Sequence, residues 1–164
     1  MRRCSEINKN VIAATLFQQD LKLVQKSDSK LMRAIGFFYP PFMTHLWTTI
    51  GDTIYYPDGI SFPLKPRYYK TIQHEIVHIK QFKRYGIPLF LFLYLFFPIP
   101  TLFSYFRWKF EREAYSQVNI KNKEDIDRVV DSLAKHYLYP WPKKWMKKWF
   151  IKELERIEHG ENSR

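Results

Sequence analysis

Apolar residues recur at helical spacing in the centre of the chain, over residues 68–85. This segment has no internal Pro or Gly, and most of its charged residues fall away from the apolar face. Pro66 precedes it, which suits a first helical turn, and Gly86 follows it, where a left-handed conformation commonly ends a helix. We therefore predict one amphipathic helix here, with an apolar face made by Ile72, Ile76, Ile79 and Phe82.

The region before this helix mixes helical and β-type patterns. Residues 5–35 predict two helical pieces interrupted at 27–29, the second of which ends at Gly36. This second piece should direct three apolar residues toward the core, Leu31, Met32 and Ile35. Residues 43–50 and 53–56 are β-rich and flank a tight turn at Gly51-Asp52, so they predict a hairpin at the edge of a small sheet.

The second half of the chain predicts three more helices. Residues 106–118 follow a helical pattern, and a further helix opens at Asn122, which suits a capping position. The apolar stripe of that helix is expected to be core and consists of Ile126, Val129, Val130, Leu133 and Tyr137. The last helix, at about 142–158, alternates paired lysines with four large apolar residues, Trp145, Met146, Trp149 and Phe150. Such a basic, aromatic face is typical of a helix lying among lipid headgroups, but docking on the protein's own core explains it equally well.

An uncharged stretch, residues 87–106, separates the central helix from the next one. It is long enough to cross a bilayer, but Pro98 and Pro100 divide it after the uninterrupted run 89–97. As a helix, that run would cover only about 14 Å of a hydrocarbon core roughly 30 Å thick. A simple transmembrane helix is therefore disfavoured, which leaves a re-entrant or interfacial segment, or a buried helical hairpin.

Composition narrows the function classes. A chain of 164 residues with 46% hydrophobic residues is expected to form a single domain, and its net charge of +11 favours an anionic neighbour. An anionic membrane surface and nucleic acid both qualify, although nucleic-acid binding rests on charge alone. The lone Cys4 excludes an intramolecular disulfide and the cysteine-based zinc sites. Since we find no signal peptide, we expect a cytoplasmic protein, peripheral to a membrane if it meets one.

The run His74-Glu75-Ile76-Val77-His78 carries the chemistry of this chain, because it reads HExxH within the predicted central helix. Imidazoles at positions i and i+4 lie about 40° apart around a helix, so both can reach one metal ion. The carboxylate between them can act as general base toward a water that zinc has made acidic. No glycine-rich phosphate loop and no nucleophile elbow competes with this motif.

A catalytic zinc site needs a third protein ligand and one open position. The next carboxylates downstream are Glu111 and Glu113, which point in different directions on the predicted helix, so only one of them can serve. His45, expected in a strand, and His136, expected at a helix end, are weaker candidates for the third ligand.

Together, the HExxH run and the segment Glu111-Arg112-Glu113-Ala114-Tyr115 resemble zincin metallopeptidases that use a glutamate as third ligand. The resemblance covers residues 45–118 and extends to small, uncharacterised peptidase-like proteins of bacteria and their phages. It implies that His74, His78 and Glu111 hold Zn²⁺ and that Glu75 is the general base. It also implies a β-strand that pairs with extended substrate, a role that we assign to residues 54–56. A hairpin that serves only the core explains these residues equally well.

This chain departs from the zincin pattern at one position. Tyr115 stands where such families have an aspartate that orients a ligand histidine, and a phenol brings no charge. Two roles for tyrosine are open: Tyr115 steadies a ligand, or alternatively Tyr68, Tyr69 or another tyrosine stabilises an oxyanion.

The prediction is an α+β, minimal zincin-like fold over residues 1–164, mostly helical with a small antiparallel sheet beside the HExxH helix. Its expected activity is zinc-dependent hydrolysis of peptide bonds in a peptide or protein substrate. The alternative is a non-catalytic protein that binds a membrane surface through residues 87–106 and the basic tail.

Overall fold

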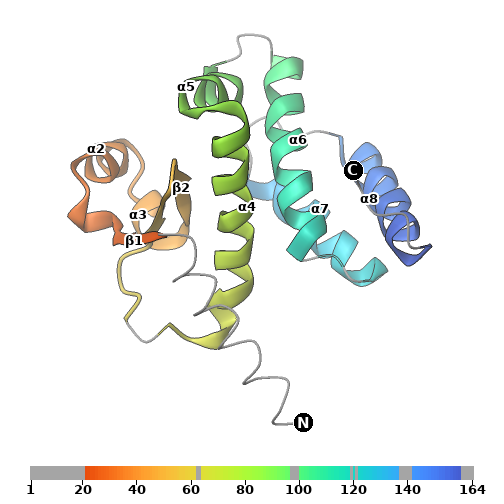
Figure 1. Ribbon diagram of the computed structural model, residues 1–164, viewed down its shortest axis with the longest axis horizontal. Helices are drawn as coiled ribbons and strands as arrows, with labels where there is room; N and C mark the ends of the chain where they lie inside the picture. Colours follow the sequence, from red (N-terminus) through yellow and green to blue (C-terminus); the bar gives the residue numbers. More distant parts are fainter. Residues whose placement is uncertain are drawn as a thin grey trace. The chain divides into compact units, whose positions relative to one another are not determined.

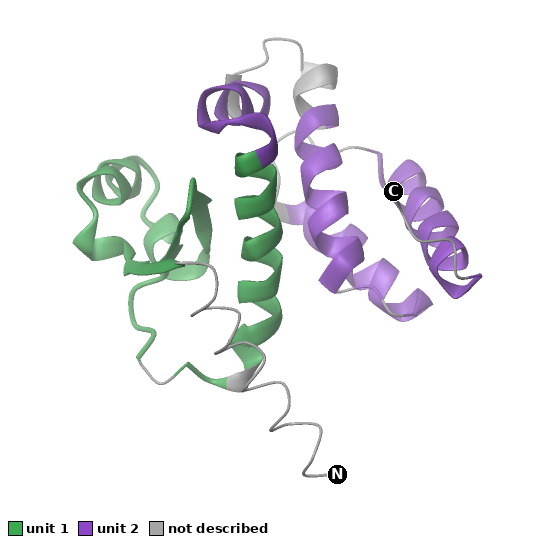
Figure 2. Cartoon of the chain, in the orientation of Figure 1, with its two compact units in different colours: residues 1–83 green, residues 84–164 purple. Residues whose placement is uncertain are grey.

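The computed structural model describes residues 21–61, 64–96, 100–118, 120, 122–136 and 142–159. The chain divides into two compact units, residues 1–83 and 84–164 (Figure 2). The described residues are mostly helical and include a three-stranded sheet, so the predicted α+β class is confirmed (Figure 1). Of the first helical piece predicted between residues 5 and 27, the part up to residue 20 lies outside the described residues. Its end was wrong, because Lys22–Gln25 form a strand.

The sheet of the first unit contains β1 (Lys22–Gln25), β2 (Thr48–Ile50) and β3 (Thr53–Tyr56), in the order β1-β3-β2. Strands β2 and β3 form the predicted antiparallel hairpin across a turn in which Gly51 has a φ of 63°. Strand β1 was not predicted, and it pairs with β3 in parallel, so the sheet is mixed rather than antiparallel. The parallel pair is possible because the intervening chain crosses over before β3 begins.

This order corrects the role that we assigned to residues 54–56. They belong to β3, whose two edges are already occupied by β1 and β2, so β3 cannot take up a substrate strand. Strand β2 pairs on one side only within the described sheet. Any backbone pairing with a substrate on that side of the hairpin therefore falls to β2.

Between β1 and β2 the chain forms a 3-10 turn, η1 (Lys26–Asp28), and the helices α2 (Lys30–Phe38) and α3 (Pro41–His45). Ser29 caps α2 by accepting a hydrogen bond from the backbone N–H of Met32 at 3.4 Å. Of the three residues expected in the core, Met32 is buried whereas Leu31 and Ile35 are exposed. The buried residues of α2 are Met32 and Gly36, so the prediction that Leu31 and Ile35 point toward the core was wrong.

Two further boundaries differ from the prediction in this region. Gly36 lies inside α2 rather than at its end. A glycine is needed at this position because Met43 of α3 packs so closely that a Cβ on Gly36 would lie 2.4 Å from Cγ of Met43. The first strand of the hairpin, predicted over residues 43–50, is shorter than expected. Met43 to His45 still belong to helix α3, and the strand starts only at Thr48.

The predicted central helix is confirmed as α4 (Tyr69–Tyr85), preceded by a 3-10 turn, η2 (Pro66–Tyr68). Gly86 follows α4 with a φ of 75°, the left-handed conformation expected there. Figure 1 shows the sheet and the short helices α2 and α3 beside this helix. The core of the first unit combines β3 with the apolar face of α4 and contains Ile54, Ile72, Ile76 and Ile79, with Leu21, Leu23, Trp47 and Leu64 packed around them.

The second unit contains α5 (Ile87–Leu91), a π-helical turn, η3 (Phe92–Phe96), and three longer helices, α6 (Pro100–Val118), α7 (Lys123–His136) and α8 (Lys143–Glu158). Helix α6 starts at Pro100, earlier than the predicted position 106. The Asn122 cap is confirmed, because its Oδ1 accepts a hydrogen bond from the backbone N–H of Asp125 at 2.9 Å. No helix among the described residues combines the length and hydrophobicity needed to cross a bilayer.

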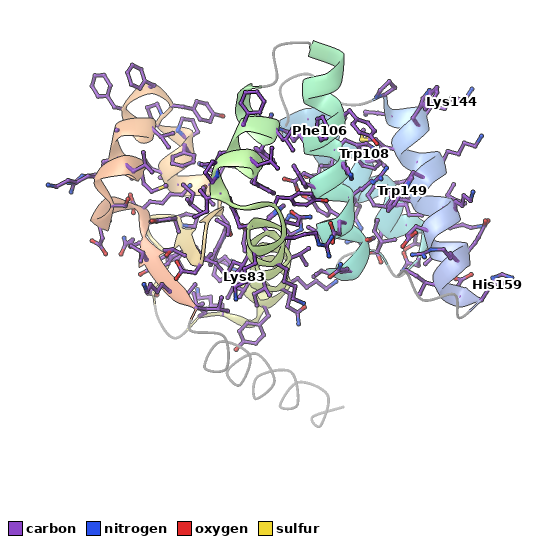
Figure 3. The ribbon with its side chains drawn as sticks, turned by 45° about the horizontal axis from the view of Figure 1, so that its top comes forward. Lys83, Phe106, Trp108, Lys144, Trp149 and His159 are labelled. Carbon is purple, nitrogen blue, oxygen red and sulfur yellow. The ribbon has the colours of Figure 1, made fainter. Side chains whose placement is uncertain are left out.

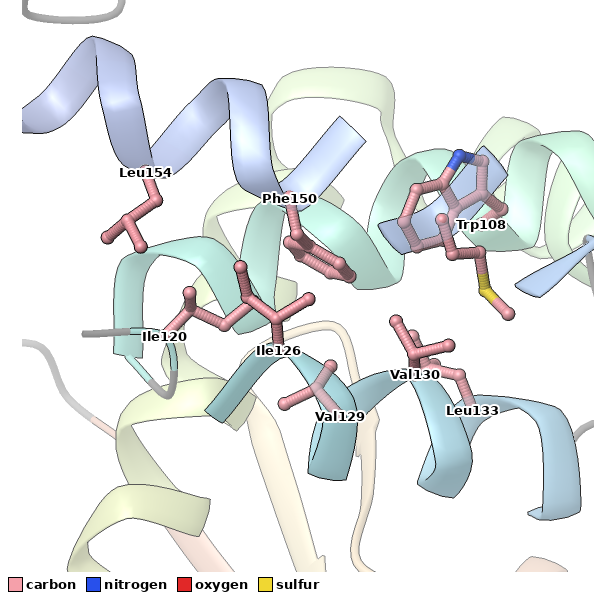
Figure 4. Packing of buried hydrophobic residues seen from close by; sticks show 9 residues of the cluster. Trp108, Ile120, Ile126, Val129, Val130, Leu133, Phe150 and Leu154 are labelled. Atoms are coloured by element: carbon pink, nitrogen blue, oxygen red, sulfur yellow. The ribbon is translucent and has the colours of Figure 1, made fainter. Parts of the chain in front are cut away.

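The core of the second unit explains much of the apolar pattern of α7 and α8 (Figure 4). Met146 and Phe150 of the basic tail are buried in it, and Trp149 packs against Trp108 at a ring-centroid distance of 5.8 Å (Figure 3). Trp145 differs from them, since 65% of its surface is exposed. The buried members of this cluster are Trp108, Ile120, Ile126, Val129, Val130, Leu133, Met146, Phe150 and Leu154, whereas Tyr137 lies outside the described residues.

Candidate metal centre

The two histidines of the HExxH run converge on one side of α4. Nε2 of His74 lies 3.2 Å from Nε2 of His78, and both side chains are buried. Zinc–nitrogen bonds of about 2.0–2.1 Å in tetrahedral geometry separate two ligand atoms by about 3.3–3.4 Å. The spacing of the two imidazole nitrogens is therefore close to the spacing that they need in order to bind one zinc ion together.

Gln81, one turn after His78, fixes the orientation of that imidazole. Its Oε1 lies 2.8 Å from Nδ1 of His78, and both groups are buried. An amide oxygen can only accept, so Nδ1 carries the proton in this contact and Nε2 keeps its lone pair. This is the outer-shell arrangement that directs a histidine toward a metal. The i, i+3 spacing of the two residues could have indicated the contact from the sequence.

Glu75 is buried beside the two histidines and is held by the sheet. The hydroxyl of Thr49, on β2, donates to Oε2 of Glu75 over 2.6 Å. Sequence reasoning did not find this contact, because Thr49 and Glu75 are distant in the sequence and only the fold brings them together.

A buried cation also acts on Glu75. Lys26 is fully buried, its ammonium donates to the backbone carbonyl of Phe42 at 2.7 Å, and it lies 3.3 Å from the centroid of the Phe42 ring. Burial lowers the pKa of Lys26 to about 8, although the charges of Glu75 and Asp58 act in the opposite direction. Glu75 therefore experiences a positive charge from Lys26 at the start of η1 as well as a hydrogen bond from β2.

In the second unit, Glu111 is buried on α6, and its Oε1 accepts a hydrogen bond from the hydroxyl of Tyr94 at 2.8 Å. The guanidinium of Arg107 lies 4.8 Å from the ring centroid of that tyrosine. Sequence reasoning missed Tyr94, although it is one of the few polar side chains in the uncharged stretch. Glu113 is more exposed and forms an ion pair with Arg84 at 3.4 Å.

His74, His78 and Glu111 each offer one ligand atom, and these atoms lie within 4.8 Å of one another. Within the described ranges, they are the group of at least three His, Cys, Asp or Glu side chains that could hold a metal ion. Two imidazoles and a carboxylate form a donor set that suits zinc and other divalent transition metals. This buried group can therefore serve as a metal site.

The remaining candidates lie elsewhere. His45 is exposed, with its Nδ1 2.6 Å from the hydroxyl of Thr44, and the side chain of His136 lies outside the described residues. Tyr115 packs against the apolar cluster of the second unit. The hydroxyl of Tyr68 accepts a hydrogen bond from Arg67 at 2.6 Å. Comparison with known proteins gives no match among family models, curated proteins or solved structures.

Proposed function

We propose that this protein is a zinc-dependent metallopeptidase. The observation that carries the proposal is the 3.2 Å approach of the His74 and His78 Nε2 atoms in an HExxH helix, with a ligand atom of Glu111 within 4.8 Å of them. Zinc is the metal that this donor set and motif favour, with His74, His78 and Glu111 as ligands.

A bound zinc ion would supply Lewis acidity, which polarises a carbonyl group and makes water a stronger acid. Glu75 is the proton carrier in this proposal. Its Oε2 is engaged by Thr49, so its Oε1 is the atom that takes a proton from water and passes it to the leaving amine. The fixed bond from Thr49 holds the carboxylate in one orientation while this happens.

The substrate in this proposal is an extended peptide. Within the described sheet, strand β2 presents backbone groups on the side away from β3, and it also carries Thr49, which bonds the general base. A peptide that adds to this edge would run close to Glu75. The proposal thus moves the substrate-pairing role from β3 to β2.

The decisive measurement is the metal content of the purified chain, followed by hydrolysis of an unfolded protein such as casein. We expect close to one zinc per chain, and loss of zinc in His74→Ala, His78→Ala and Glu111→Ala. Glu75→Gln should keep the metal and lose hydrolysis, because the amide cannot accept the proton. Glu113→Ala is the matched control for Glu111→Ala, since it lies on the same helix and pairs with Arg84. Proteolysis retained in Glu75→Gln, or zinc lost only in Glu113→Ala, would contradict this assignment.

The competing hypothesis is a non-catalytic protein that binds a membrane surface through residues 87–106 and the basic tail. Exposure of Trp145 among lysines of α8 favours it. Truncation before α8 would not test it, because Phe150 and Met146 belong to the core of their unit. Trp145→Ser is the suitable variant, and this hypothesis expects it to lose binding to anionic vesicles. A wild-type chain that binds metal but hydrolyses no protein substrate would also support this alternative.

A further inference from the structure

The last two residues of helix α2, Phe37 and Phe38, and its C-cap, Tyr39, are three consecutive exposed aromatic residues. Phe37 is 81% exposed, Phe38 is 86% exposed, and Tyr39 is also exposed. The rings of Phe37 and Phe38 contact each other edge-to-face at a centroid distance of 5.4 Å. We call Phe37, Phe38 and Tyr39 the aromatic tip.

The tip continues an apolar stripe along α2. Leu31, Ile35 and Phe38 stand at i, i+4 and i+7, which places them on one face of the helix, and all three are exposed. A different side of α2 meets the rest of the unit through Met32 and Gly36, both of which are buried. The helix therefore has one apolar side that packs in the protein and a second apolar side that is exposed to solvent. The second side is not used in the packing of this unit.

The polar residues of α2 are both basic. Lys30 and Arg33 are exposed and stand at i and i+3 relative to each other, with Phe37 on the same flank at i+7 from Lys30. The helix contains no acidic residue, and the nearest in the sequence is Asp28 in η1. The whole chain has a net charge of +11. Adjoining aromatic and cationic side chains, on a chain of this charge, complement an anionic lipid surface.

We propose that the aromatic tip inserts into the headgroup region of an anionic phospholipid bilayer, with Lys30 and Arg33 placed against the lipid phosphates. The site is separate from the candidate metal centre, and this inference does not depend on the proposed peptidase activity. It also differs from the membrane contacts expected from the sequence, which involved residues 87–106 and the basic tail. Much of the tail's apolar face is already used, since Met146 and Phe150 are buried in their own unit.

The test is co-sedimentation of the full chain with vesicles made of phosphatidylcholine and phosphatidylglycerol, compared with vesicles of phosphatidylcholine alone. Wild type should bind the mixed vesicles, and less so as salt is raised. Phe37→Ser with Phe38→Ser should weaken partitioning roughly tenfold or more, because two exposed rings no longer leave water. Phe37→Trp with Phe38→Trp should bind at least as well as wild type. Circular dichroism and the thermal unfolding midpoint, unchanged in the double serine variant, exclude unfolding as the cause.

Trp145→Ser is the matched control, because it removes an exposed aromatic residue among lysines on α8. It should leave vesicle binding unchanged. The proposal is overturned if wild type does not bind the mixed vesicles, or if Trp145→Ser rather than the double serine variant loses binding. It is also overturned if the aromatic tip proves to hold a second copy of the chain, seen as a dimer that the double serine variant dissociates. Vesicle binding that appears only after removal of residues 1–20 would also overturn it, because the aromatic tip would then bind that segment in the full chain.

Discussion

The hydroxyl of Thr49 donates a 2.6 Å hydrogen bond to Oε2 of Glu75, which joins strand β2 to the HExxH helix at the proposed general base. Thr49 pairs with Ile54 across the hairpin, so its backbone is fixed by the sheet. The orientation of the carboxylate thus depends on the register of β2 as well as on α4.

Thr49→Val should lower kcat roughly tenfold or more while leaving zinc content and KM near their wild-type values. Valine keeps the shape of threonine but removes the donor, and hydrogen bonds to charged groups contribute about 1.5–3 kcal/mol. Thr49→Ser should restore most of the activity, and Thr48→Val is the control on the neighbouring position of the same strand. Equal kinetics for Thr49→Val and Thr48→Val would show that the bond does not position the base.

Tyr94→Phe should weaken zinc binding roughly tenfold, because it removes the hydroxyl that bonds the Glu111 carboxylate at 2.8 Å. The measurement is competition against a chromogenic zinc chelator. Tyr115→Phe is the informative comparison, since the zincin resemblance assigns ligand support to Tyr115 and the structure places this residue against the apolar cluster of the second unit. Weaker binding in Tyr115→Phe alone would favour the role expected from the resemblance.

Lys26 should make the protein more stable as the pH rises above about 8. The pKa of Lys26 is lowered from 10.5 to about 8 by burial, so between these values the unfolded chain holds a proton that the folded chain has released. Unfolding free energy must then increase with pH across that interval, and this contribution is absent below it. In Lys26→Met the rise should be smaller by about 1–3 kcal/mol, as measured by urea unfolding at several pH values.

Lys22→Met is the control for the pH experiment, because Lys22 is exposed and forms only a 3.8 Å ion pair with Asp52. Its stability should follow the wild-type pH dependence. If Lys26→Met and Lys22→Met had the same pH profile, the ammonium of Lys26 would not be the group that titrates there.

Phe150→Ala should destabilise the protein by about 3–5 kcal/mol, since Phe150 is fully buried in the cluster of the second unit. Trp145→Ala on the same helix should change stability by only about 0.5 kcal/mol, because Trp145 is exposed. Thermal or chemical unfolding compares the two variants directly. Similar losses in both would mean that α8 is held differently from the packing in Figure 4.

The elements that local patterns determine were predictable from the sequence. Helix α4 has an uninterrupted apolar face between Pro66 and Gly86, and the β2–β3 hairpin surrounds a glycine with positive φ. Each signal lies within a few residues of the structure that it specifies. The metal-site hypothesis had the same advantage, because two of its ligands are one helical turn apart.

The features that were missed depend on residues distant in the sequence. Strand β1 is defined by its parallel pairing with β3, and this pairing makes β3 the central strand, which leaves β2 as the edge of the predicted hairpin. Thr49 and Tyr94 similarly acquire their roles only when the fold brings a hydroxyl to a carboxylate. A helical or alternating pattern contains no information about such partners, which explains why the supporting residues were not found.

The close approach of Gly36 to Met43 restricts how helix α2 can be engineered. Replacing a helical glycine with alanine usually strengthens a protein, since the unfolded chain loses conformational freedom. At this position the added methyl group would collide with the Met43 side chain. The routine stabilising exchange should therefore force the Met43 side chain out of its packing on α2, so directed-evolution libraries intended to improve expression should leave this codon unchanged.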